Sequence, residues 1–153
     1  MDSGPIVLTK RIKAHSAPDC YLPLTADQRS VLRARRLTTC GREVLLQLPR
    51  DGALRPGDQL TDDGESVCIH VSAASEPLLH VTADHPLALL KAAYHLGNRH
   101  VALELHEHEL LLLDDSVLAS MLKGRGLFVT QCRRPFLPEG GAYAGHSHRH
   151  SLP

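Results

Sequence analysis

Residues 78–132 read LLHVTADHPLALLKAAYHLGNRHVALELHEHELLLLDDSVLASMLKGRGLFVTQC, and strand-like and helix-like patterns alternate along them. Short runs of leucine and valine are typical of strands, whereas longer stretches that begin at Asp or Pro and end at Gly are typical of helices. The predicted elements are, in order, a strand at 78–81, a helix at 87–96, a hairpin of strands at 101–106 and 109–113, a helix at 117–123 and a strand at 127–132. This βαββαβ order predicts a ferredoxin-like domain.

Capping residues set the expected ends of the two helices. Asp84 is the expected N-cap of the first helix, with Pro86 in its first turn and Gly97 closing it. Asp115 or Ser116 is expected to cap the second helix.

The part of the chain before residue 75 has a different rhythm. Strand-forming runs at 44–48 and 66–71 alternate with turn signals such as Arg55-Pro-Gly-Asp58, which predicts a small all-β domain at residues 1–74. The boundary is expected near Ser75-Glu76-Pro77, and the ferredoxin-like domain then spans residues 75–138. Residues 139–153 are rich in Gly and His and cannot build a core, so we expect a flexible His-containing tail. The predicted fold class is α+β.

The composition bounds the class of protein. The chain has 153 residues, and its 42% of hydrophobic residues is too high for a disordered protein. Its longest apolar runs, at 87–90 and 110–113, are far too short to cross a bilayer. The first residues lack the charge order of a signal peptide. We therefore expect a cytoplasmic protein without a membrane partner.

Charge is distributed unevenly although the formal net charge is zero. Residues 29–55 carry seven arginines against two acidic residues, whereas residues 58–115 carry eleven acidic residues against two basic ones. Opposite signs indicate two modules with different partners. Because the chain has only five aromatic residues to stack on bases, the arginines favour a solvated strand face or an acidic protein partner over nucleic acid. The Arg-rich stretch that this interpretation concerns comprises four of the seven, Arg29, Arg33, Arg35 and Arg36.

The cysteines and the catalytic motifs point away from covalent chemistry. The four cysteines, at positions 20, 40, 68 and 132, form no CxxC pair, so we expect reduced, mostly structural thiols. The sequence also contains neither a Gly-rich phosphate loop nor a nucleophile elbow. The chain is not expected to be an enzyme.

Histidine is over-represented, with eleven residues, seven of which fall at 95–108 and 146–150. Imidazole is the commonest nitrogen ligand of borderline metals, so metal binding is the leading hypothesis. The candidate ligands are His95, His100, His146, His148 and His150.

Each group of histidines also has a simpler interpretation. His95 falls in the last turn of the predicted helix, where the helix dipole alone favours it. His100 is expected to open the next strand and is, alternatively, an ordinary surface residue. His106 and His108 lie about 6.8 Å apart if the chain is extended and share one face, but they are equally interpreted as turn residues. The histidines at 146–150 suit rapid capture and release of a metal, with a plain spacer as the alternative.

Longer stretches of the chain match a known pattern. The most specific is Ala93-Tyr-His-Leu-Gly-Asn-Arg-His100. Others are Leu24-Thr25, Arg33-Ala-Arg-Arg36, Leu48-Pro-Arg50, Leu54-Arg-Pro-Gly-Asp58, Asp63-Gly64, Val117-Leu118, Met121-Leu122, Pro135-Phe136 and Gly141-Ala-Tyr143. With these residues the chain resembles the urease accessory protein E family, the nickel metallochaperones of urease maturation, along nearly its whole length.

The resemblance implies a different role for each domain. The N-terminal β domain of such a protein engages other proteins, and the ferredoxin-like domain binds metal and forms a homodimer. His100 resembles the principal ligand, which faces its copy across the dimer axis; His95 resembles an auxiliary ligand, and the tail histidines complete or feed the site. Nickel is then passed to an accessory GTPase and on to the urease apoprotein.

The chain departs from some relatives at two places. Where they carry a His-x-His pair before the second helix, this chain has Asp114-Asp-Ser116. Its tail is also short, which favours delivery of one or two ions over storage of many.

The expected function is therefore that of a nickel(II) carrier acting as a homodimer or, on metal binding, as a dimer of dimers. Zinc(II) or copper(II) is also expected to bind such imidazole sites in vitro, because copper(II) outcompetes nickel(II) at most nitrogen ligands. The alternatives are an RNA- or ribosome-associated module that uses the Arg-rich β domain, and a zinc or copper buffer.

Overall fold

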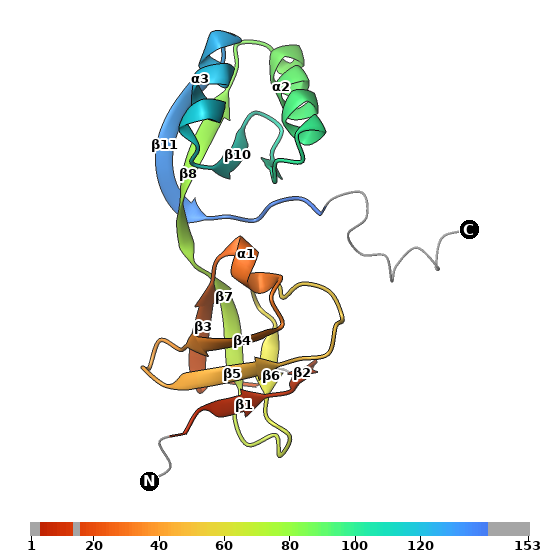
Figure 1. Ribbon diagram of the computed structural model, residues 1–153, viewed down its shortest axis with the longest axis vertical. Coiled ribbons are helices and arrows are strands. Elements are labelled where there is room, and N and C mark those ends of the chain that lie inside the picture. Colours follow the sequence, from red (N-terminus) through yellow and green to blue (C-terminus); the bar gives the residue numbers. More distant parts are fainter. Residues whose placement is uncertain (1–3, 14–15, 141–153) are drawn as a thin grey trace, which may run out of the picture. The chain divides into compact units, whose positions relative to one another are not determined.

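The computed structural model describes residues 4–13 and 16–140, and the chain divides into two compact units, Met1–Ala74 and Ser75–Pro153 (Figure 1). Within the described part of the chain, no helix is both long enough and apolar enough to span a membrane.

The first unit is built from short strands. They are β1 (Ile6–Leu8), β2 (Lys10–Ile12), β3 (Cys20–Leu24), β4 (Arg33–Leu37), β5 (Glu43–Gln47), β6 (Gln59–Thr61) and β7 (Ile69–Ala73), with the one-turn helix α1 (Ala26–Arg29) after β3. Two sheets result, with strand orders β1-β5-β4 and β2-β6-β7-β3. The small β fold expected of this half of the chain is confirmed.

Alternation along the strands creates the core of this unit. Cys20, Leu22 and Leu24 of β3 are buried, while the residues between them are exposed. Val44 and Leu46 of β5 join the same core by the same two-residue period. On β4 the arginines at positions 33 and 35 are exposed, as predicted for a solvent-facing edge of the strand.

The prediction of four reduced cysteines is wrong for one pair. Cys20 on β3 and Cys40 in the turn between β4 and β5 form a disulfide, with their Cα atoms 6.3 Å apart. Cys68 and Cys132 are free. Linear spacing could not reveal the pair, because only the folded sheets bring the β4–β5 turn beside β3; the Thr39 amide, for example, donates to the Tyr21 carbonyl.

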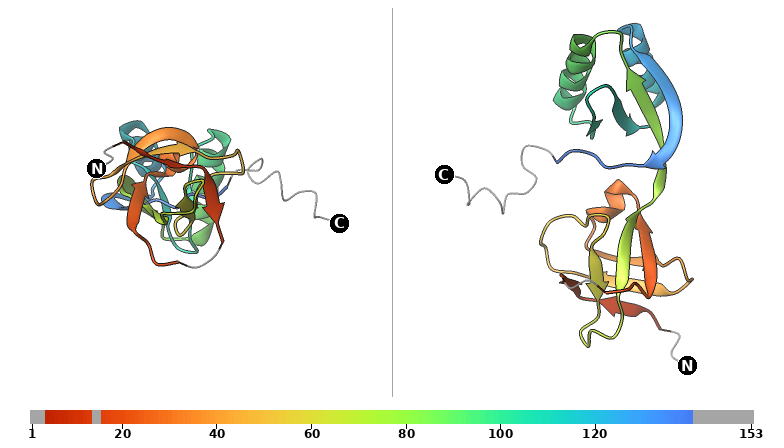
Figure 2. Two further views of the ribbon diagram at one scale, coloured as in Figure 1. Left: turned by 90° about the horizontal axis from the view of Figure 1, so that it is seen from below. Right: turned by 180° about the vertical axis from the view of Figure 1, so that it is seen from behind.

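The second unit has the predicted βαββαβ order. Its elements are β8 (Ser75–Thr82), α2 (Pro86–Asn98), β9 (Glu104–Leu105), β10 (Leu110–Leu113), α3 (Ser116–Gly124) and β11 (Phe128–Pro135). The strand order is β11-β8-β10-β9 with every pair antiparallel, so sequence-adjacent strands β8 and β9 flank β10. Figure 2 shows β8 and β11 side by side along their length. The ferredoxin-like prediction and the α+β class are confirmed.

Both helices of this unit pack on one face of the sheet. Leu79 and Val81 of β8 form a core with Leu110 and Leu112 of β10, on the face that these alternating positions share. The helices add the apolar side chains Leu89, Ala92, Leu96 and Leu122 to it. The opposite face carries the buried Leu78 and Leu111 together with His80.

The ends of the elements differ from prediction around α2. His85, not Asp84, is the N-cap, and the helix runs through Gly97 to Asn98. Pro86 begins the helix because its missing amide would have no partner there. For α3, Asp115 caps as predicted, accepting from the Val117 and Leu118 amides.

Candidate metal centre

His100 lies in the turn that follows α2, and not at the start of a strand as predicted. Its φ is +59°, in the left-handed region that non-glycine residues seldom adopt. Its amide donates to the Gly97 carbonyl at 2.9 Å, and the Val101 amide donates to the Leu96 carbonyl at 3.1 Å. These bonds end the helix by a tight reversal, which delays the next strand until Glu104.

The His100 side chain is exposed. Among residues 4–13 and 16–140, its imidazole takes part in no hydrogen bond or ion pair. A side chain that is exposed on a defined turn can accept an external ligand.

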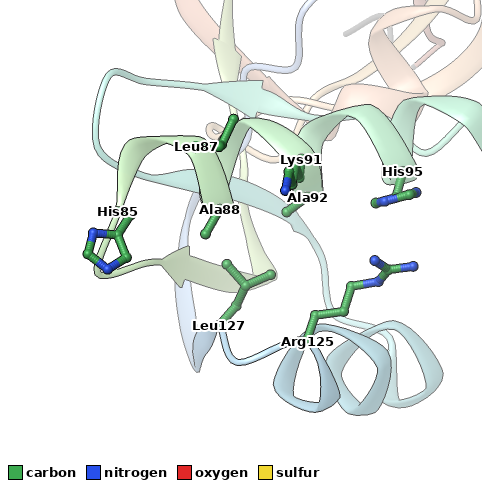
Figure 3. Close-up of a pocket in the computed structure, with 8 residues that line it drawn as sticks. All are labelled: His85, Leu87, Ala88, Lys91, Ala92, His95, Arg125 and Leu127. Atoms are coloured by element: carbon green, nitrogen blue, oxygen red, sulfur yellow. The ribbon is translucent and has the colours of Figure 1, made fainter.

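His95 lies in the last turn of α2, as predicted, and is half-buried. Its ring meets the Tyr94 ring edge-on, with centroids 5.5 Å apart. Figure 3 shows its imidazole at the mouth of a cavity beside α2, across from the Arg125 guanidinium. His95 and His100 thus occupy the end of the same helix and the turn after it.

His106 and His108 are turn residues, the simpler of the two interpretations. β9 ends at Leu105, and the His106 amide closes the hairpin on the Glu109 carbonyl at 3.0 Å. The His106 Nε2 atom donates to Glu104 at 2.6 Å, whereas the His108 ring lies 3.7 Å from the Glu107 carboxylate. The two imidazoles therefore have different partners and do not form a pair.

A charged network that the sequence analysis missed covers part of the helix-free face of the sheet. Glu104 and Glu109 both contact the Arg134 guanidinium, at 3.5 and 3.4 Å. His80 donates to Glu109 at 2.5 Å, and the Leu137 amide donates to Glu104 at 2.8 Å. These residues come from four separate segments, so only the strand order brings them together. In the sequence, the only sign of this network was that each predicted strand of the hairpin contains a glutamate, Glu104 in the first and Glu109 in the second.

The network lowers the pKa of both carboxyl groups. Burial of Glu104 raises its pKa, but the hydrogen bonds from His106 and the Leu137 amide and the charge of Arg134 outweigh burial. For Glu109, burial is likewise outweighed by the hydrogen bonds from His80 and Arg134. Both groups are therefore held in the charged form by their neighbours.

No three His, Cys, Asp or Glu side chains converge on a common point anywhere in residues 4–13 and 16–140. The remaining predicted ligands, His146, His148 and His150, lie outside the described residues.

An apolar stripe runs along α2 toward His100. Leu87, Leu90 and Tyr94 are 58%, 68% and 67% exposed, and their i, i+3, i+7 spacing places them on one side of the helix. The buried side of α2 is formed by other residues, namely Leu89, Ala92 and Leu96. The stripe is therefore a second apolar surface that the unit itself leaves uncovered.

Comparison with known proteins agrees with this architecture. Residues 7–74 match the family model described as UreE urease accessory protein, N-terminal domain, and residues 76–152 match the corresponding C-terminal domain. The chain is 62% identical over 149 residues to the urease accessory protein UreE of Parasynechococcus marenigrum (strain WH8102), covering 97% of this chain and 99% of that protein. It is 63% identical over 154 residues to UreE of Synechococcus sp. (strain CC9311), with the same coverage of both chains.

A more distant relative gives the same result. UreE of Thermosynechococcus vestitus (strain NIES-2133 / IAM M-273 / BP-1) is 48% identical over 131 residues, which cover 86% of this chain and 91% of that protein. On these matches, which together span nearly all of its length, the chain belongs to the UreE urease accessory protein family.

Proposed function

We propose that the protein is a nickel(II) metallochaperone that acts in urease maturation. It binds nickel(II) as cargo and delivers it, through an accessory GTPase, to the urease apoprotein, and it is not itself an enzyme. His100 is the principal ligand and His95 an auxiliary one, and the tail histidines 146, 148 and 150 feed or complete the site. The N-terminal β unit engages the protein partners, and the protein works in the cytoplasm.

One observation carries this proposal: the imidazole of His100 is exposed on a tight turn and has no partner within the described part of its chain. A left-handed residue fixes the direction in which its side chain leaves the backbone. The ligand is thereby oriented before the metal arrives, which lowers the entropy cost of binding.

The apolar stripe of Leu87, Leu90 and Tyr94 supports a homodimer. Uncovered apolar side chains on one helix face are typical of a contact with another protein. A two-fold interface presents the same surface on both copies, so a contact along the C-terminal part of α2 would bring two His100 side chains toward one axis. Two copies together could then supply the ligands of one metal site. Within the described residues of a single chain, no three His, Cys, Asp or Glu side chains gather into such a site.

Such a site suits transfer. A four-thiolate cage holds a metal permanently, whereas a few imidazoles from separate chains leave coordination positions open to the recipient. Tails from both copies would raise the local concentration of ligands without closing the site. An imidazole set also binds other divalent metals, so affinity alone does not identify the cargo.

The test replaces His100 by Asn, which tolerates the left-handed conformation and therefore preserves the turn. Loss of an outer-shell group alone weakens metal binding about 10–100-fold, so loss of the ligand should weaken nickel binding at least that much. Calorimetric titration of the full chain with nickel(II) measures this effect. His108→Asn is the matched control, because the His108 side chain is 81% exposed and lies in another turn.

The second readout is transfer. Nickel-loaded wild-type protein should activate the urease apoprotein when the GTPase is present, and His100→Asn should not. Unchanged nickel affinity in His100→Asn would refute the ligand assignment. Tight binding without any transfer would instead indicate a metal buffer.

A further inference from the structure

A cavity of about 400 Å³ lies between α2 and the turn that joins α3 to β11 (Figure 3). Its wall carries four basic side chains, from His85, Lys91, His95 and Arg125. The rest of the lining is apolar and consists of Leu87, Ala88, Ala92 and Leu127. A concave apolar surface with a few converging polar groups is the usual form of a binding site.

The frame of this cavity is well anchored. Ala92 and Leu127 are only 2% and 6% exposed and belong to the core. The turn at Gly126, with φ +85°, is held by the Leu127 amide, which donates to the Leu122 carbonyl at 3.1 Å. Arg125 therefore leaves a fixed backbone position, and its guanidinium lies across the mouth from His95.

No acidic side chain of the described residues pairs with the basic side chains of the cavity. Within residues 4–13 and 16–140, no ion pair involves Lys91, His95 or Arg125. No Asp or Glu lines the cavity, and of all the acidic residues of the chain only Asp2 lies outside the described residues. Elsewhere in the same unit, Arg134 is paired with two glutamates.

We propose that this cavity binds an acidic side chain of a partner polypeptide. The planar guanidinium of Arg125 matches a carboxylate, and Lys91 adds a second cationic donor. The apolar floor of Ala88, Ala92 and Leu127 fits the methylene stem of a glutamate and the residue beside it. A free inorganic phosphate offers the charge but nothing for this floor.

The cavity shares only Leu87 with the stripe assigned to the homodimer. Leu90 and Tyr94, the two most exposed members of the α2 stripe, do not line the cavity. At 100° per residue, the cavity side of α2 and the stripe are about a quarter-turn apart. His95, the proposed auxiliary nickel ligand, lines the cavity, so the test of this site uses the metal-free protein, in which nickel(II) and the acidic group do not compete.

The test uses the metal-free, ¹⁵N-labelled full chain and two peptides, N-acetyl-Leu-Glu-amide and N-acetyl-Leu-Gln-amide. The glutamate peptide should shift the amides of Lys91 and of residues 125–127 saturably in NMR spectra. The glutamine peptide should bind about tenfold or more weakly, because it lacks the charge-assisted hydrogen bonds. Inorganic phosphate, added alone, should bind more weakly than the glutamate peptide.

Arg125→Gln should weaken binding of the glutamate peptide about tenfold. The matched control is Lys123→Gln, which removes the same charge two residues away from an exposed position outside the cavity. Lys91→Gln tests the opposite wall of the cavity and should also weaken binding of the glutamate peptide. It replaces Arg125→Gln as the test if the NMR spectrum shows that Arg125→Gln does not fold. Equal weakening by Lys123→Gln, equal binding of the two peptides, or preferential binding of phosphate would each overturn the proposal.

Discussion

Glu104 sits on a two-residue strand, yet its carboxylate has three partners: His106, Arg134 and the Leu137 amide. Its side chain is only 9% exposed. A buried carboxylate is tolerated only when its oxygens are hydrogen-bonded, so these contacts hold the start of the segment after β11 against β9.

Glu104→Gln should destabilise the second unit by about 1–3 kcal/mol, because it removes a charged acceptor from donors that stay in place. Hydrogen exchange of residues 75–140 measures this change without interference from the first unit. Glu107→Gln, at a side chain 87% exposed, is the control and should change little. Equal protection in the two variants would contradict the structural role of Glu104.

The network should also make this unit sensitive to acid. The pKa of Glu104 is lower in the folded than in the unfolded chain, so its stabilisation is complete above the ordinary value of 4.5. The stabilisation is lost as the pH falls through the folded-state pKa. Unfolding measured from pH 7 to pH 2 should show a smaller loss at low pH for Glu104→Gln than for the wild type. Parallel curves would exclude this contribution.

At the scale of elements, the N-terminus of α2 has no side-chain cap. Its N-cap is His85, whose side chain makes no capping hydrogen bond, whereas Asp115 caps α3 with two. The prediction that Asp84 caps α2 was wrong because Pro86 occupies the first helical position, which places the cap one residue later.

His85→Ser should stabilise the second unit by about 0.5–1 kcal/mol, because a serine oxygen can accept from a free amide of the first turn. For a domain of this size, such a gain raises the melting temperature by roughly 2–8 °C in a thermal scan. Asp84→Ser, one residue earlier, is the control. A gain in the control and none at position 85 would contradict the cap assignment.

The disulfide belongs to the same scale, since it links β3 to the β4–β5 turn. Without reductant, thiol titration of the unfolded chain should detect Cys68 and Cys132 alone. Reduction should destabilise the first unit by about 3 kcal/mol, the amount expected for a loop of this length. Titration of all four thiols would contradict the pairing.

At the scale of the whole molecule, the stripe on α2 predicts the oligomeric state. Leu90→Glu places a charge in the centre of the proposed dimer contact, where charged residues are depleted. Light scattering should then show the monomer mass, and nickel(II) should bind more weakly because ligands from two copies no longer meet.

Val117→Glu is the matched control for this prediction, because Val117 is 70% exposed on α3 and lies outside the stripe. It should leave the dimer intact. If Leu90→Glu also stays dimeric, the contact lies elsewhere on the protein.

The local pattern of residues determined the βαββαβ order, the β character of the first half and the position of His95 in the last turn of α2, because periodicity and capping act over a few neighbouring residues. Only tertiary structure decided the Cys20–Cys40 pair, the Glu104 network and the basic cavity, because each joins segments far apart in the chain. The left-handed turn at His100 falls between these cases: Gly97 predicted the end of the helix nearby, but hydrogen bonds back to the helix set the position of the turn.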